Sequence, residues 1–380
     1  MARTPYLSVV MPCLNEEKTV ASCVQKARAA IKRGKLRGEV IVSDNGSTDN
    51  SIKLARKAGA RVVEEKRKGY GSAYLAGIIA AKGDWVVMGD SDGTYDFSAI
   101  LDLLRPLADG FDMVIGSRLA GRLEKGSMPL LNRYLGTPTL NFFIRLFYNI
   151  KVSDSQSGMR AFTKEAFSRL QLKTTGMEFA SEMLVRAGQE KLKITEVPIN
   201  YSSRIAPTKL SRFRDAWRHI RFMLLFAPTY LFLIPGGIIM LLGFLGVLSV
   251  ALGEITLFGR LLNVHAMVLG SMLTLLGYQI IMLGVYAKAY SWTQGFNTGS
   301  LVMTQTLKYF RLEKGLYLGF LFALLGLLVG GLTFVQWAKE GFGYLWALRP
   351  AILSMTFFVL GVQIIFSSFF LSILGIEKRN

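Results

Sequence analysis

Four long apolar stretches in the second half of the sequence constrain the fold most strongly. They lie near Tyr230 to Leu252, Ala266 to Tyr286, Leu316 to Val335 and Ala351 to Leu374. Each is close to the ~20 residues that a helix needs to cross a bilayer. None carries a charged residue well inside it, so the spans themselves offer no ion or proton pathway. We therefore expect an all-α transmembrane domain of four helices over residues 229–380.

The pattern of charges predicts how the chain sits in the membrane. Basic residues gather between the second and third spans and at the end of the chain, whereas the other two loops mix both signs. Lys and Arg favour cytoplasmic loops, so we expect a multi-pass protein of the cytoplasmic membrane whose head and both termini are cytoplasmic. The basic residues concerned are Lys288, Lys308, Arg311, Lys314, Lys378 and Arg379.

The formal net charge of +19 favours anionic partners. A basic head beside a membrane meets anionic lipid headgroups and phosphate-bearing substrates. The sequence contains no recognisable motif for reading nucleic acid, and we expect no nucleic-acid partner. The lipid bilayer is the expected surface, and the four-helix tail leaves homo-oligomerisation open.

A basic segment joins the head to the first span. Phe213, Trp217, Ile220 and Leu224 fall on one helical face, with the arginines of the segment largely elsewhere. This pattern is typical of an amphipathic helix that lies in the membrane interface. We expect such a helix over residues 211–228.

The polar head, residues 1–210, alternates short Val- and Ile-rich runs with amphipathic stretches that end at glycine. This alternation predicts an α/β domain whose mostly parallel sheet is covered on both faces. Such sheets bind ligands beyond the carboxyl ends of their strands. The expected strands are Leu7 to Met11, Glu39 to Ser43, Arg61 to Glu64, Asp84 to Gly89 and Asp112 to Gly116, with a further strand in "KITEVPINYS" after a helix around Glu182.

Polar clusters follow four of these strands, namely "PCLNEE", "SDNGSTD", "GDSDGTYD" and "GSR". Any one of them is more simply a turn, because Asn, Asp, Gly and Ser favour turns. All four would converge on one edge of the sheet, and this joint pattern predicts a ligand site there.

Asp90 and Asp92 stand one residue apart directly after an apolar run. Two carboxylates in this position can both reach one hard divalent cation, which completes its shell with water and substrate phosphates. The alternative is a solvated turn whose acids cap the next helix, a role that suits Asp96 best. We expect Mg²⁺ or Mn²⁺ carrying a diphosphate.

The sequence has no GxxxxGK[ST] phosphate loop and no kinase-like motif set. Departure of a nucleoside diphosphate is therefore favoured over phosphoryl transfer, and the expected donor is a nucleotide sugar. Asp44 could accept a hydrogen bond from a base N–H, and Gly69 and Gly71 would let the backbone approach a phosphate or sugar. A plain turn is the alternative at each position.

The two histidines of the chain, His219 and His265, lie outside the expected site, so a histidine base is not expected. An acceptor that is already ionised, such as a phosphate, needs no strong base but needs cations to hold it. The candidate cations are Arg118, Arg133, Arg204 and Lys209, each of which could instead be a plain surface charge.

Seven motifs between roughly Leu7 and Phe226 resemble, in their order, those of a known family. The family is the inverting GT-A glycosyltransferases that make polyprenol-phosphate sugars, the dolichol-phosphate mannose and glucose synthase group. The resemblance implies a Rossmann-like GT-A head and metal-dependent, inverting transfer of a hexose. The donor would be of the UDP-glucose or GDP-mannose type, and the acceptor a polyprenyl or dolichyl phosphate. The motifs are "VVMPCLNEEKTV", "VSDNGSTDNS", "KGYGSA", "GDSDGTYD", "GSR", "DSQSGMRAF" and "EVPINY".

The resemblance also implies roles for individual residues. Asp90 and Asp92 would hold the metal. Catalysis would rest on Asp92, Arg118 and Asp154, the last as a base or orienting group near the acceptor. The residues implied to bind the nucleotide sugar are Pro12, Asn15, Glu16, Asp44, Lys68, Gly69, Gly71, Asp90 and Ser91, and those implied to face the lipid phosphate are Arg118, Arg133, Arg204 and Lys209.

Two positions depart from the family pattern. Asn45 replaces the second Asp of the usual "DDGS", and Thr94 stands where the mannosyl members commonly carry a Gln metal ligand. Either Thr94 or water would then complete the metal shell.

Two other functions remain as alternatives. A processive membrane glycan synthase would carry a QxxRW signature, which is not found in the sequence. A non-catalytic membrane scaffold or flippase would not need the paired aspartates. Metal-dependent sugar transfer to a lipid phosphate is the favoured function.

Overall fold

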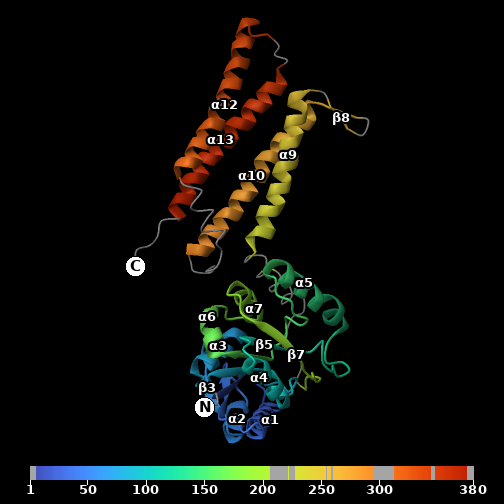
Figure 1. Cartoon of the computed structure of the whole chain (residues 1–380), viewed down its shortest axis with the longest axis vertical. Coiled ribbons are helices and arrows are strands. Elements are labelled where there is room, and N and C mark those ends of the chain that lie inside the picture. Colours follow the sequence, from blue (N-terminus) through green and yellow to red (C-terminus); the bar gives the residue numbers. More distant parts are fainter. Residues whose placement is uncertain are drawn as a thin grey trace. The chain divides into compact units, whose positions relative to one another are not determined.

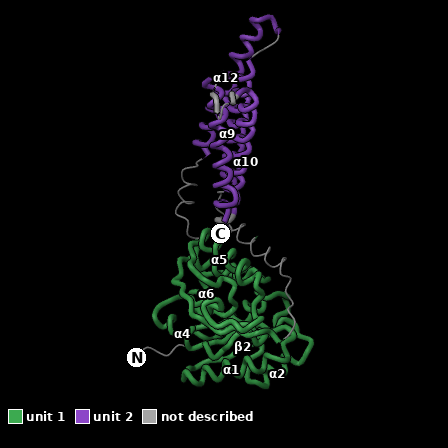
Figure 2. The backbone as a smooth tube through the Cα atoms, turned by 90° about the vertical axis from the view of Figure 1, so that its right-hand side faces the viewer, with its two compact units in different colours: residues 1–223 green, residues 224–380 purple. Residues whose placement is uncertain are grey.

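The computed structural model describes residues 6–205, 221, 227–253, 255–257, 260–293, 312–343 and 347–374. The chain divides into two compact units, residues 1–223 and 224–380 (Figure 2). Lys209 and almost all of the interfacial helix predicted over residues 211–228 lie outside the described residues.

The first unit is an α/β domain built on one seven-stranded sheet (Figure 1). Its strand order is β3-β2-β1-β4-β6-β5-β7, and every pairing is parallel except those of β6 with β4 and β5. The strands are β1 (Leu7–Cys13), β2 (Gly38–Asp44), β3 (Arg61–Glu64), β4 (Trp85–Met88), β5 (Met113–Ser117), β6 (Arg160–Thr163) and β7 (Ile194–Pro198). The helices are α1 (Val20–Arg33), α2 (Ser51–Lys57), α3 (Tyr70–Ala80), α4 (Ile100–Ala108), α5 (Thr137–Tyr148), α6 (Lys164–Leu170) and α7 (Phe179–Gln189), with short turns of helix at Phe97–Ala99 and Asn132–Gly136.

Alternation of side chains along the strands divides the core into two layers. Val9 and Met11 of β1 pack with the helices α1, α2 and α4 on one face of the sheet. Val10 of β1 and Ile41 of β2 point to the other face and pack with α3, α5, α6 and α7. Because both faces are covered, the apolar strands of the middle of the sheet are buried throughout.

The predicted α/β head with a mostly parallel sheet is confirmed. The five expected strands correspond to β1 to β5, and the expected helix around Glu182 and the strand after it are α7 and β7. The antiparallel strand β6 was not expected from the sequence. Its first three residues belong to the "DSQSGMRAF" motif, and the strand pairs with β4 through Arg160↔Met88, so the end of this motif forms part of the sheet.

The described part of the second unit contains four long apolar helices, as predicted. They are α9 (Ile234–Leu252, preceded by a helical turn at Thr229–Leu233), α10 (Val264–Thr293), α12 (Leu312–Lys339) and α13 (Leu348–Leu374). A small hairpin of β8 (Ile255–Leu257) and β9 (Arg260–Leu262) connects α9 to α10.

Small residues let these helices approach one another closely. A Cβ added at Gly243 of α9 or at Gly361 of α13 would collide with the backbone of the partner helix, α10 or α12 respectively. Ser271 of α10 and Thr356 of α13 share a buried hydrogen bond of 2.7 Å, which links the two helix pairs. This packing is typical of membrane helices, which associate through close contact and interhelical hydrogen bonds.

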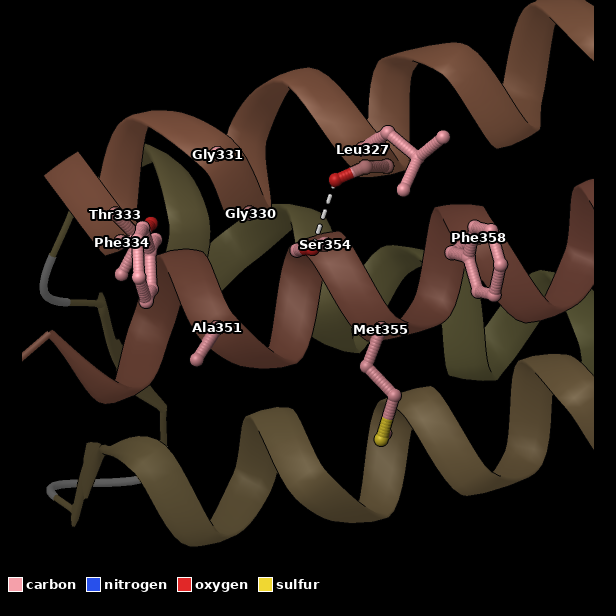
Figure 3. Close-up of a pocket in the computed structure, with 10 residues that line it drawn as sticks. Leu327, Gly330, Gly331, Thr333, Phe334, Ala351, Ser354, Met355 and Phe358 are labelled. Carbon is pink, nitrogen blue, oxygen red and sulfur yellow. Dashed lines mark hydrogen bonds between the residues drawn. The ribbon is translucent and has the colours of Figure 1, made fainter.

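A shallow hollow of about 490 Å³ lies along α12 and α13. Figure 3 shows its floor, where the Ser354 hydroxyl donates a hydrogen bond of 2.8 Å to the Gly326 carbonyl. Gly330, Gly331 and Ala351 widen the hollow because they carry little or no side chain. The hydroxyl of Ser354 is thus already paired within the unit, and the rest of the lining is largely apolar.

Candidate active site

The loops after β1 and β2 are tied together by side-chain hydrogen bonds. Asn15 adopts a left-handed backbone conformation, with φ 53°, which asparagine tolerates better than most residues. Its side-chain oxygen accepts a hydrogen bond of 2.7 Å from the Thr48 N–H, and its own N–H donates 2.9 Å to the Ser47 hydroxyl. Asn15 therefore holds the two loops in register, and its predicted contact with nucleotide stays a prediction.

Asp44 is the last residue of β2. One of its carboxylate oxygens accepts hydrogen bonds, and the other accepts none among the described residues. Oδ2 accepts the N–H groups of Gly46 and Ser47 at 2.8 and 2.9 Å. Oδ1 is buried and has no hydrogen-bond partner among the described residues. A buried acceptor without a partner is costly, so this atom is a natural place for a donor N–H on a ligand.

The hydrogen bonds of Asn45 explain why an asparagine replaces the second Asp of the family pattern. Its amide nitrogen donates to the carbonyl oxygens of Glu65 and Arg67 at 3.1 and 2.8 Å, and its amide oxygen accepts the Gly69 N–H at 2.7 Å. A carboxylate could not donate to the two carbonyls. The asparagine thus fastens the segment that leads into α3.

The structure gives Gly69 and Gly71 a packing role that the sequence did not suggest. A Cβ on Gly69 would collide with the Thr175 carbonyl, and one on Gly71 with the Thr174 carbonyl. The Lys68 ammonium donates to the carbonyl oxygens of Asn45 and Gly46, at 2.9 and 3.5 Å. Close approach of this chain's own backbone therefore accounts for both glycines, and a donor contact at these three positions stays a prediction.

The loop after β4 places the two aspartates. The Ser91 hydroxyl between them donates to the Pro12 carbonyl at 2.6 Å, and the Ser91 carbonyl accepts from the Thr19 hydroxyl at 2.7 Å. Pro12 and Ser91, both predicted to bind nucleotide, thus anchor this loop to β1 and to the start of α1. Asp90 and Asp92 lie on either side of Ser91, so its anchored backbone holds both of them.

Asp90 is partly buried, and one of its oxygens accepts two hydrogen bonds. Oδ1 accepts hydrogen bonds from the hydroxyls of Tyr70 and Tyr74 at 3.0 and 2.9 Å. Burial and then the nearby charge of Asp92 raise the pKa of Asp90 to about 6. Two carboxylates of like charge therefore stand close together without full compensation.

Asp92 is held by Thr94 and approached by an arginine. Its Oδ1 accepts the hydroxyl and the N–H of Thr94, at 2.6 and 3.1 Å. Its Oδ2 lies 3.6 Å from Nε of Arg204, whose Nη2 forms an ion pair of 2.6 Å with Glu16. The Thr94 hydroxyl is therefore committed to orienting Asp92.

The residues present fit a hard divalent cation. Asp90 and Asp92 offer carboxylate oxygens, which suit Mg²⁺ or Mn²⁺, and the arginine at 3.6 Å shows that Asp92 already attracts a positive charge. Among the described residues no cluster of three or more His, Cys, Asp or Glu side chains could hold a metal ion. A metal here would take its other ligands from substrate phosphate and water.

Arg118, after β5, is locked to Asp154. Nε and Nη2 of the guanidinium donate to Oδ2 and Oδ1 of Asp154, both at 2.8 Å, and the Arg118 N–H adds a third bond of 2.9 Å to Oδ2. Asp154 is completely buried. With both oxygens bound to one arginine, Asp154 suits an orienting role better than proton transfer.

A chain of aromatic contacts joins Arg118 to the paired aspartates. The guanidinium lies 5.2 Å from the ring centre of Tyr201, which packs edge to face on Tyr95 at 5.1 Å. The Tyr95 hydroxyl accepts the Gly158 N–H at 2.7 Å, and Gly158 adjoins Asp90, because a Cβ built on it would lie 3.0 Å from Oδ2. The structure thus brings two of the predicted phosphate residues, Arg118 and Arg204, into one neighbourhood with the predicted metal ligands.

Two charged residues that sequence reasoning missed, the half-buried Glu196 and the buried Arg160, shape the loop before β6. Glu196 accepts the N–H groups of Ser153 and Asp154 at 2.8 and 3.1 Å. Arg160, completely buried, donates to the carbonyl oxygens of Ser155, Ser157 and Ala180. Both residues lie in motifs singled out above, "EVPINY" and "DSQSGMRAF", which was the available signal. Their contacts show that they fix the backbone around Asp154.

Arg133 lies apart from this cluster. It is exposed in the helical turn at Asn132–Gly136, with its guanidinium 5.4 Å from the ring centre of Tyr134. Among the described residues, no hydrogen bond or ion pair joins it to Arg118 or to the aspartates. Its surroundings are unusually apolar for a surface: Leu130, Leu131, Tyr134, Leu135, Phe142 and Leu146 are all exposed.

Much of the chain is similar in sequence to known glycosyltransferases. Residues 8–171 match the pattern of the family described as glycosyl transferase family 2, and residues 285–375 match the glycosyltransferase family 2 C-terminal transmembrane region. The low-salt glycan biosynthesis hexosyltransferase Agl6 of Haloferax volcanii is 40% identical over 98% of this chain and 89% of its own length. The dolichyl-phosphate hexose transferase of the same organism is 36% identical over 54% of this chain and 87% of its own length. A structure of glucosyl-3-phosphoglycerate synthase from Mycobacterium tuberculosis with phosphoglyceric acid is 25% identical, with a TM-score of 0.48 over 59% of this chain and 80% of that one.

Proposed function

The chain belongs to glycosyltransferase family 2, as a glycosyltransferase with a C-terminal transmembrane region, and we propose that it transfers a hexose from a nucleotide sugar to a polyprenyl phosphate. An oxygen of the lipid phosphate attacks the anomeric carbon while the bond from that carbon to the diphosphate breaks. The nucleoside diphosphate leaves with the electron pair, and the configuration at the carbon inverts. The attacking phosphate is already ionised, so no side chain has to remove a proton.

The observation that carries this proposal is the pair of aspartates after β4. Asp90 and Asp92 stand close enough for Asp92 to raise the pKa of Asp90, and within the described residues the nearest cation is Arg204 at 3.6 Å. Both aspartates would hold Mg²⁺ or Mn²⁺ through their open oxygens. The bound metal would neutralise charge that develops on the departing diphosphate.

The donor end of the site rests on Asp44. Its buried Oδ1 lacks a partner within the described residues, and a base N–H would satisfy it. Asn15 and Asn45 hold the loops on either side of this atom through the hydrogen bonds described above. A rigid hydrogen-bond acceptor between these two loops suits recognition of a nucleobase rather than of the sugar.

The acceptor end rests on Arg118. Asp154 occupies two of its guanidinium nitrogens, whereas Nη1 has no hydrogen bond among the described residues. Asp154 therefore orients Arg118 and leaves the N–H groups of Nη1 for an acceptor phosphate. The relative named as a dolichyl-phosphate hexose transferase supports a lipid phosphate as the acceptor.

The apolar surface around Arg133 supports delivery of the acceptor from a bilayer. Leu130, Leu131 and Leu135 are more than half exposed, at 71%, 51% and 60%. A basic residue among exposed apolar side chains is typical of a surface that contacts lipid headgroups. We place this surface, with the rest of the head, on the cytoplasmic side, in keeping with the basic loop between the second and third spans.

The test is sugar transfer by the purified full-length protein in detergent. The protein is offered a short polyprenyl phosphate and a panel of labelled UDP and GDP sugars, with Mn²⁺ or with EDTA. Metal-dependent labelling of the lipid by one donor would support the proposal and identify the sugar. Growth of a free polysaccharide would instead indicate a processive synthase, and nucleotide binding without any product would indicate a scaffold.

A further inference from the structure

Two tyrosines of α3 converge on one oxygen of Asp90. Tyr70 and Tyr74 are four residues apart and therefore lie on the same helical face. Their hydroxyls donate to the same atom, Oδ1, at 3.0 and 2.9 Å. The rings pack edge to face with centroids 4.9 Å apart, and Tyr74 also stacks on Phe179 of α7 at 5.7 Å. Neither hydroxyl oxygen can move away from Asp90 without disturbing this packing.

The other oxygen of Asp90 is left open. Oδ2 has no hydrogen bond within the described part of the chain, and it faces Gly158, where any side chain would crowd it. Both phenols act as donors to one oxygen, so they fix the orientation of the carboxylate. Asp90 is therefore presented as a fixed ligand with its other oxygen free of hydrogen bonds among the described residues.

The start of α3 is itself fixed from two sides. The Gly69 N–H donates to Asn45 at 2.7 Å, and the Ser72 N–H donates to the Thr175 carbonyl at 3.1 Å. Helix N-termini often bind phosphate through such N–H groups. Here two of them are already used inside the protein, so this end of α3 is built for rigidity.

Glu182 of α7 holds the segment that packs against the glycines. It is 1% exposed, and its Oε2 accepts the hydroxyl and the N–H of Thr174 at 2.6 and 2.9 Å. The carbonyls of Thr174 and Thr175 in turn occupy the space above Gly71 and Gly69. An unbroken series of contacts thus runs from α7 through this segment and the start of α3 to Asp90.

We propose that Tyr70 and Tyr74 are positioning residues of the metal site, and that the "KGYGSA" motif serves to aim them at Asp90. The inference rests on the proposed function, because it takes Asp90 to be a metal ligand. Groups that hydrogen-bond to metal ligands commonly contribute 10- to 100-fold to metal affinity. Neither tyrosine would touch the donor or the acceptor.

The experiment measures Mn²⁺ binding to the full-length protein in detergent, by the electron paramagnetic resonance signal of free Mn²⁺, with no nucleotide present. The variants are Tyr70→Phe, Tyr74→Phe and the double variant, which keep both rings and remove only hydroxyls. We expect each single variant to weaken Mn²⁺ binding about 10-fold and the double variant about 100-fold. Tyr148→Phe removes a hydroxyl from α5, away from Asp90, and should bind as the wild type does.

The possible outcomes separate this inference from the proposed function. If the wild type binds Mn²⁺ and the three Phe variants bind it equally well or more tightly, the positioning role is wrong while the metal site stands. If the wild type binds no Mn²⁺ in this assay or with UDP and GDP added, the metal assignment itself fails and this inference fails with it. Unchanged thermal unfolding of the Phe variants would show that weaker binding does not come from a damaged fold.

Discussion

Two buried carboxylate sites in the head differ in how their charge is balanced. Asp154 is enclosed by Arg118, which supplies two side-chain hydrogen bonds of 2.8 Å and one from its backbone. Asp90 and Asp92 receive neutral donors from tyrosine and threonine hydroxyls, and the cation nearest to them among the described residues stands 3.6 Å from Asp92. The charge of the first site is fully paired, whereas the described residues leave that of the second only partly compensated.

This difference separates structural from ligand-binding carboxylates. A buried charge is tolerated only when it is paired. The ion pair between Asp154 and Arg118 therefore accounts for both buried charges without any ligand. The pair after β4 has no such explanation within the described residues. We therefore propose that Asp90 and Asp92 bind a cation and that Asp154 orients Arg118.

The largest expected effect follows from removing charge at the unbalanced site. Asp92→Asn should abolish sugar transfer, because the amide cannot supply an anionic ligand, while the protein still inserts into the membrane. Transfer from the identified donor to a polyprenyl phosphate is the measurement, with thermal unfolding as the check on folding. Asp96→Asn is the matched control, since Asp96 only caps the following helical turn through Ser98. Turnover of Asp92→Asn at the wild-type rate would show that the metal assignment is wrong.

Removing charge from the balanced site should damage the fold. Asp154→Ala leaves Arg118 buried without its partner, a change that typically costs about 3–5 kcal/mol of stability. Pulse proteolysis of the head in detergent would measure the loss. The double variant Arg118→Met with Asp154→Leu should recover most of the stability but not the transfer activity. Should Asp154→Ala remain as stable as the wild type and lose only turnover, the residue would be a base and the comparison would be wrong.

The sequence predicted those parts of the molecule that depend on local patterns. Alternating apolar runs indicated β1 to β5, and runs near 20 residues indicated the four membrane helices. The strand β6 was not predicted because its four residues follow a polar segment. They pair with β4 and β5, which lie far away in the sequence. Pairing between distant segments is set by the whole sheet, so it cannot be recognised in a short stretch of sequence.

The site shows the same limit at the level of single residues. Polar clusters at strand ends located Asp90, Asp92 and Asp44, because the topology of a parallel sheet brings those ends together. The partners of these residues could not be predicted. Tyr70 and Tyr74 are spaced as core residues of any helix would be, and only the folded chain shows that their hydroxyls meet at Asp90. Likewise, Asn45 departs from the family pattern for a reason that lies in three backbone partners.

The smallest expected effect is a gain in Mn²⁺ affinity, whereas the variants above are expected to lose activity or stability. Arg204 bridges Glu16 and Asp92 with 24% of its side chain exposed, so it competes with a metal for the same carboxylate. Arg204→Gln should therefore bind Mn²⁺ more tightly, by roughly tenfold, because a like charge about 4 Å from the metal ligand is removed. The same variant should transfer sugar more slowly if Arg204 also helps to hold a phosphate.

Arg204→Lys provides the control for this prediction, since it keeps the positive charge and should keep the wild-type Mn²⁺ affinity. Because the interaction is electrostatic and partly exposed to solvent, the difference between the Gln and Lys variants should shrink as the salt concentration rises. If Arg204→Gln bound Mn²⁺ no more tightly than the wild type at low salt, the arginine would not oppose the metal. The unbalanced site would then have more internal compensation than its distances indicate, and the contrast with Asp154 would weaken accordingly.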